Sequence, residues 1–186
     1  MERYQGGIKA MTYLNNTLRI MIDPGYGCDD DRMPNTCPGD ENINLSIAFY
    51  LRYELEKEGM QHIELTRYSN IYVPLARRIE LAELYNADMF ISIHCDNFYR
   101  EKENGYTIWI GTAATGNTFL LADRTNRNFT RDFPNHKRFG IKHGKHQVVN
   151  QPRTSILVEC KAIRKPENQV KFAQSIKDAV IWCAKR

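Results

Sequence analysis

A short apolar run, broken only by one serine, occupies residues 89–93 and ends at His94. A helical pattern precedes this run, and the polar residues 95–97 follow it. An apolar run bounded in this way is typical of a buried strand in a mainly parallel sheet. Because such sheets bind ligands outside the carboxyl ends of their strands, His94 is a candidate functional residue.

Strand and helix patterns alternate along the chain, which indicates an α/β protein. We predict a single domain of residues 1–186, with its core at about 18–184 and no separate cell-wall-binding domain. We expect a mainly parallel, twisted central sheet of about six strands, flanked by helices on both faces. The predicted strands, besides 89–93, are 18–23, 62–67, 106–110 and 155–159.

Four helices are predicted from periodicity and from residues that start or stop helices. The first begins at Asp40, ends at Gly59 and buries a stripe of apolar residues spaced four apart, from Ile43 to Leu55. The second begins near Pro74 and places Arg78 among exposed charges. The third covers about 117–133, and a terminal helix opens at 166 with its buried face running from Val170 to Val180. Residues 135–150 are expected to be irregular.

The composition is that of an ordinary soluble globular protein, with 42% hydrophobic and 26% charged residues. No apolar run approaches the roughly 20 residues that would cross a bilayer. The net charge of +4 is mild, and no basic-aromatic stripe indicates nucleic-acid binding. The five cysteines show neither a disulfide framework nor a zinc-ribbon spacing, so we expect mainly free, buried thiols; Cys28 and Cys37 could pair under oxidation.

Two further predicted strands end in residues that suit a functional site. The first strand runs into Asp23-Pro24-Gly25-Tyr26-Gly27, and the last ends at Glu159. Glu41 falls in the first turn of a helix, where the helix dipole alone would favour a carboxylate. His143 and His146 lie three residues apart in the segment expected to be irregular, and either could bind a metal or simply be exposed.

Taken together and in order, these stretches resemble the zinc-dependent N-acetylmuramoyl-L-alanine amidases of the amidase type 3 family. The resemblance runs from about Leu18 to Ala184. It is carried by the segments 20–27, 41–45, 65–67, 75–78, 87–94 and 156–159.

The resemblance implies hydrolysis of the amide bond between N-acetylmuramic acid and L-alanine in peptidoglycan. It also implies a Zn²⁺ cofactor, with Glu41 and His94 as metal ligands and Glu159 as the catalytic residue. The first ligand position, a histidine in the family, holds Tyr26 in this chain.

Three consequences of Tyr26 remain open. Tyr26 could coordinate zinc as a phenolate, or His143 or His146 could replace the missing ligand. Alternatively, the chain could be a degenerate relative that binds peptidoglycan with an impaired zinc site. A different zinc peptidase chemistry is a further alternative.

Peptidoglycan is the expected partner, and we expect no nucleic acid, no membrane span and a monomer. The first residues show no apolar signal core, which predicts synthesis in the cytoplasm without a signal peptide. The chain in this respect resembles a phage endolysin, which reaches the cell wall after release.

Overall fold

The computed structural model describes residues 15–27, 40–96, 104–114, 116–161 and 163–186, without the side chains at positions 40, 41 and 96. The described residues form six strands and four helices. In chain order these are β1 (Arg19–Pro24), α1 (Asp40–Lys57), β2 (His62–Leu65), α2 (Leu75–Leu84), β3 (Met89–Asp96), β4 (Gly105–Gly111), α3 (Gly116–Asp132), β5 (Lys137–Gly144), β6 (Thr154–Lys161) and α4 (Pro166–Ala184).

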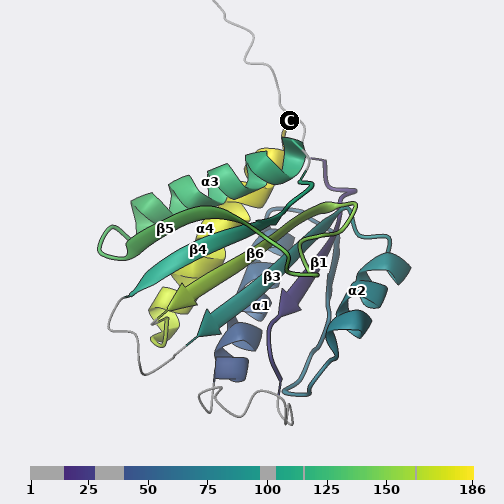
Figure 1. Ribbon diagram of the computed structural model, residues 1–186, viewed down its shortest axis with the longest axis horizontal. Coiled ribbons are helices and arrows are strands. Elements are labelled where there is room, and N and C mark those ends of the chain that lie inside the picture. The colour runs from purple at the N-terminus through teal and green to yellow at the C-terminus, as the bar shows by residue number, and fades with distance from the viewer. Residues whose placement is uncertain (1–14, 28–39, 97–103, 115, 162) are drawn as a thin grey trace, which may run out of the picture.

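All six strands join one twisted sheet in the order β2-β1-β3-β6-β4-β5 (Figure 1). Neighbouring strands are parallel except β4 and β6, which are antiparallel. The prediction of a mainly parallel α/β sheet is therefore confirmed. In Figure 1 the arrowheads of β1, β3 and β6 lie along the same edge of the sheet.

The two faces of the sheet bury different clusters, because successive strand residues point to opposite sides. The larger cluster contains Ile20, Ile91 and Val158 together with apolar residues of α1, α3 and α4. The smaller cluster contains Met21, Phe90 and Leu157 with residues of α2 and the segment 148–149. Helices therefore cover both faces, three on one and α2 on the other.

Helix α1 forms as its periodicity predicts. Ile47, Leu51 and Leu55 are fully buried, and Ile43 packs against the same cluster. Gly59 follows the helix with φ +90°, and the Met60 amide donates to the Leu55 carbonyl. This is the Schellman arrangement, in which a glycine ends a helix without steric penalty.

The prediction that residues 135–150 are irregular is wrong, because β5 occupies Lys137–Gly144. This edge strand is mostly exposed or half-buried and therefore lacks a clear hydrophobic alternation. A register shift interrupts its pairing with β4, and Gly140 adopts φ +80° at that point. The bulge breaks the twofold periodicity by which a strand is recognised in a sequence.

The prediction that Arg78 lies on the exposed face of its helix is also wrong. Arg78 is only 5% exposed, whereas Leu75, predicted to be on the apolar face, is 39% exposed. The reason is a buried carboxylate on β1, Asp23, with which the Arg78 guanidinium pairs.

Cys95, Cys160 and Cys183 are free thiols, the first two of them buried. Cys28 and Cys37 lie outside the described residues. Among the helices that the structure describes, none combines the length and apolar character needed to cross a membrane.

Candidate active site

His94 and Glu159 lie side by side at the carboxyl edge of the sheet. They are register partners on the parallel strands β3 and β6. Paired residues of adjacent strands project from the same face, and the strands lie about 4.8 Å apart. Two predicted site residues, 65 positions apart in the sequence, are therefore immediate neighbours in the fold.

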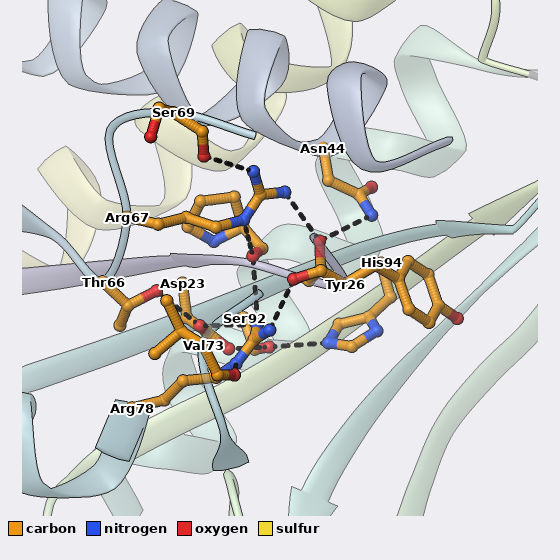
Figure 2. Close-up of polar contacts among 12 residues, drawn as sticks. Asp23, Tyr26, Asn44, Thr66, Arg67, Ser69, Val73, Arg78, Ser92 and His94 are labelled. Atoms are coloured by element: carbon orange, nitrogen blue, oxygen red, sulfur yellow. Dashed lines mark hydrogen bonds and ion pairs between the residues drawn. The ribbon is translucent and has the colours of Figure 1, made fainter. Parts of the chain in front are cut away.

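A buried hydrogen-bond chain stands behind His94. Ser92 lies 3.0 Å from His94 Nε2 through its Oγ, and the same hydroxyl donates to Asp23 Oδ2 at 2.7 Å (Figure 2). Thr66 donates to the other oxygen of Asp23 at 2.7 Å, and Arg78 lies 3.1 Å from it. This chain fixes the orientation of the imidazole.

Asp23 is completely buried, and burial alone raises the pKa of a carboxyl group. The charges of Arg78 and His94 and the hydrogen bonds from Thr66 and Ser92 outweigh this effect, so the pKa of Asp23 is lower than its ordinary value. The carboxylate at the end of the chain is therefore ionised.

The loop after β1 is held through its carbonyl groups. Arg67 donates to the carbonyls of Pro24 and Gly25 at 3.0 and 2.8 Å. Arg78 donates to the carbonyls of Pro24 and Tyr26 at 3.0 and 2.6 Å, and Figure 2 shows the two guanidinium groups converging on this turn. The backbone from 24 to 26 is therefore fixed independently of the Tyr26 side chain.

Tyr26 lies against His94. Its ring meets the imidazole edge-on, with ring centroids 5.2 Å apart, and its φ is +60°. The preceding residue must be glycine, because a Cβ on Gly25 would come within 2.7 Å of the His94 ring. The structure thus brings Tyr26 and His94 together.

The N-terminal part of α1 is anchored at the same edge of the sheet. Asn44 donates to the Gly25 carbonyl at 3.3 Å and accepts from the Cys95 amide at 2.6 Å. Glu41 lies three residues earlier in this helix, but its side chain is outside the described residues. The anchor therefore brings the backbone around Glu41 near the ends of β1 and β3.

Glu159 is oriented by a residue that the sequence does not single out. Trp109 of β4 donates its indole Nε1–H to Glu159 Oε2 at 2.6 Å. The antiparallel pairing of β4 with β6 places Trp109 opposite Leu157, on the same face as Glu159. A strand pattern predicts that residues 106–110 are extended, but it does not reveal this partner.

Cavities of about 280 Å³ lie on each side of the His94–Glu159 pair. One is lined by Tyr26, His94 and His146 with apolar residues such as Val73 and Leu157. The other is lined by Glu159, Trp109, Phe139 and Lys142, together with residues of β4 and β6. An extended substrate that lies over His94 and Glu159 could occupy both cavities.

The two loop histidines have different positions. His143 pairs with Ile110, on the sheet face opposite His94, and contacts the Gly111 carbonyl and the Phe119 ring. His146 lines the cavity that contains His94 and Tyr26, and its ring lies 4.8 Å from that of Trp109. Of the two, His146 is on the side of the candidate site.

Among the described side chains, no three His, Cys, Asp or Glu residues are grouped closely enough to hold a metal ion. The chemistry around His94 nevertheless fits a metal ligand, because ligating histidines are usually oriented by a hydrogen bond to their other ring nitrogen. Here Ser92 and Asp23 supply that support. A carboxylate oxygen, the donor type of Glu41, is also an ordinary zinc ligand, whereas position 26 offers a phenol oxygen.

Comparison with known proteins identifies the family. The family model for Amidase_3, described as N-acetylmuramoyl-L-alanine amidase, matches residues 20–181. Because this match covers most of the sequence, the chain belongs to the Amidase_3 family.

Two relatives illustrate the similarity. The chain is 35% identical over 91 residues to the N-acetylmuramoyl-L-alanine amidase AmiC of Escherichia coli O6:H1, covering 48% of this chain and 22% of that protein. It is 31% identical over 132 residues to AmiA of Salmonella typhimurium, covering 68% of this chain and 45% of that protein. The chain thus matches less than half the length of these relatives.

Solved structures share the fold over nearly the full chain. An N-acetylmuramoyl-L-alanine amidase from Clostridium difficile 630 superposes with a TM-score of 0.78 and 24% identity, over 89% of this chain and 95% of that one. An amidase of Nostoc punctiforme gives 0.76 and 24%, over 91% and 98%. At this identity the likeness supports the fold alone.

Proposed function

We propose that the protein is a zinc-dependent N-acetylmuramoyl-L-alanine amidase, which hydrolyses the amide bond between the lactyl group of N-acetylmuramic acid and L-alanine in peptidoglycan. The observation that carries this proposal is the pairing of His94 with Glu159 at the carboxyl edge of the sheet. Membership in the Amidase_3 family supports it.

We assign Glu41, His94 and Tyr26 as the residues that would hold zinc. A bound zinc ion would supply Lewis acidity that polarises the scissile carbonyl and makes water more acidic. His94 is suited to this role because Ser92 and Asp23 fix its ring. Tyr26 stands where the resemblance implies a histidine, and its ring lies against that of His94.

We assign Glu159 as the general base and then the general acid. Its carboxylate would take a proton from the attacking water and deliver it to the leaving amide nitrogen. Trp109 Nε1 donates to Oε2, so we place the transferred proton on Oε1. The indole holds the carboxylate in one orientation, which lowers the entropic cost of reaching the reactive geometry.

The experiment is digestion of isolated peptidoglycan by the purified chain supplied with zinc, followed by mass spectrometry of the soluble fragments. We expect new amino termini on L-alanine and intact lactyl groups on the glycan, and we expect a chelator to stop their release. Glu159→Gln should retain zinc but lose hydrolysis, since it removes the base and leaves the ligands. Loss of zinc in that variant would instead assign Glu159 as a ligand.

Tyr26 favours a second candidate, a peptidoglycan-binding relative with an impaired zinc site. In that case the chain sediments with cell walls, binds less than one zinc ion per chain and releases no alanine termini. Release of other amino groups with the muramic acid–alanine bond intact would indicate a different peptidase.

A further inference from the structure

The cavity beside Glu159 has the construction of a binding pocket. It lies on the β4, β5 and β6 strands and is walled by the rings of Trp109 and Phe139. Its volume of about 280 Å³ is close to the lower limit for small-molecule sites. Because Glu159 is one of its lining residues, a ligand in the cavity would lie beside the proposed catalytic residue.

Two glycines make room for the aromatic walls. A Cβ on Gly105 would lie 2.4 Å from Phe139 Cε2, and a Cβ on Gly144 would lie 2.9 Å from Trp109 Cε3. Any side chain at either position would push a ring out of place. Gly105 and Gly144 therefore allow the rings of Phe139 and Trp109 to form the walls of the cavity.

Lys142 brings a positive charge to these walls. Its Nζ lies 5.5 Å from the ring centroid of Trp109 and 5.5 Å from that of Phe139. Within the part of the chain that the structure describes, no carboxylate forms an ion pair with Lys142. Lys142 is also exposed, so an anionic ligand in the cavity can reach its ammonium group. Two lysines, Lys142 and Lys161, and one carboxylate, Glu159, line this cavity, so its charged residues sum to a net positive charge.

The cavity on the other side of His94 differs in charge. Its charged members Asp23 and Arg78 neutralise each other at 3.1 Å, and the rest of its lining is largely apolar or aromatic. An acidic half of a substrate would therefore be favoured on the Lys142 side, and an uncharged half on the Tyr26 side.

We propose that the pocket formed by Trp109, Phe139 and Lys142 binds the acidic stem peptide on the amine side of the scissile bond. Lys142 pairs with the α-carboxylate of its second residue, a glutamate linked through its side chain. This inference rests on the proposed function and names the specificity determinant of the same site. Lys142 would then discriminate between stem peptides in which that carboxylate is free and those in which it is amidated.

The test compares two peptides that differ at one group: L-alanyl-γ-D-glutamyl-L-lysine and its α-carboxamide. Both are products of the proposed reaction, so turnover does not disturb a binding titration with the unaltered protein. We expect calorimetry to show about fivefold tighter binding of the carboxylate form, the effect of one partly exposed ion pair. Lys142→Met should remove the preference while retaining an aliphatic chain on the rings, and Lys142→Arg should retain it.

Lys145→Met is the matched control, because Lys145 is exposed three residues further on and does not line the pocket. It should leave the preference unchanged. With the corresponding muramyl peptides as substrates, Lys142→Met should raise KM for the carboxylate form more than it lowers kcat.

Equal binding of both peptides, no binding of either, or a preference that survives in Lys142→Met would overturn the inference. Peptide preference without release of alanine termini would uphold the pocket and reject the proposed hydrolysis. Hydrolysis without a Lys142-dependent preference would uphold the proposed hydrolysis and reject the pocket.

Discussion

At the scale of single residues, Arg78 joins the fold to the site. Its guanidinium neutralises the buried Asp23 and also binds the carbonyls of Pro24 and Tyr26. Asp23 in turn supports Ser92, which contacts His94. Arg78, which the sequence pattern predicts to be exposed, therefore supports the imidazole of His94 that we assign as a zinc ligand.

Arg78→Met is expected to destabilise the protein by about 3–5 kcal/mol, since it leaves a buried carboxylate without its partner. Urea unfolding followed by circular dichroism measures this loss. Arg77→Met is the neighbouring control: the Arg77–Glu80 pair is exposed, so the change should cost less than about 1 kcal/mol. Equal losses in the two variants would contradict the role of Arg78.

Tyr26→His is expected to strengthen zinc binding, because a neutral imidazole is an ordinary zinc ligand and a phenol must first lose its proton. The gain should be about tenfold or more, since changes to residues that only support a ligand already alter metal affinity by that much. Position 26 has φ +60°, a region where histidine is more frequent than most residues. Competition with a fluorescent chelator measures the affinity.

Tyr72→His is the control for that variant, because it adds a histidine to the same cavity at a different position. If both variants gain equally, or if neither gains, then position 26 is not a ligand position.

At the scale of helices and strands, α3 and α4 are joined by a polar contact beside their apolar one. Phe129 and Phe172 stack with ring centroids 4.5 Å apart. Near the end of α3, Asp132 accepts from Ser175 of α4 at 2.7 Å. Hydrogen bonds from Arg131 and Ser175 hold the pKa of Asp132 below its ordinary value of 3.8.

This lowered pKa gives a pH-dependent stability with a defined sign. The unfolded chain binds the proton more tightly, so the contribution of Asp132 is present above pH 3.8 and is lost as pH falls through the lower folded value. Asp132→Asn should cost about 1 kcal/mol at neutral pH, and the difference from the unaltered protein should shrink below about pH 4. Denaturant unfolding at several pH values measures it, and a difference that grows in acid would refute the assignment.

Sequence patterns at this scale predicted most elements, since buried strands and amphipathic helices repeat their apolar residues locally. They missed β5, because an edge strand with a bulge need not bury a regular face. They also misplaced Arg78 and did not single out Trp109. The partners of these residues, Asp23 and Glu159, lie 55 and 50 positions away in sequence, where no local pattern reaches.

At the scale of the whole molecule, the sheet couples its two hydrophobic clusters. Strands β1, β3 and β6 contribute residues to both, so neither cluster can be lost while the other keeps its strands. We expect one cooperative unfolding transition.

The two tryptophans allow this to be measured, since Trp109 packs on the α2 side and Trp182 lies on α4. In Trp109→Phe and in Trp182→Phe, the remaining fluorescence should change at the same denaturant concentration as the circular dichroism. Midpoints that differ between the two signals would show that the faces unfold separately.

The hydrogen bonds from Arg67 and Arg78 to the loop after β1 bear on how position 26 can change during evolution. Arg67 and Arg78 bind carbonyl oxygens from Pro24 to Tyr26, and these hydrogen bonds do not involve the side chain at position 26. The φ of +60° still favours residues such as histidine, asparagine and aspartate there. A single codon change there can alter the donor offered to a ligand while the surrounding architecture stays intact. Related proteins could therefore replace the ligating side chain at this position, or lose it, while they keep the ability to fold.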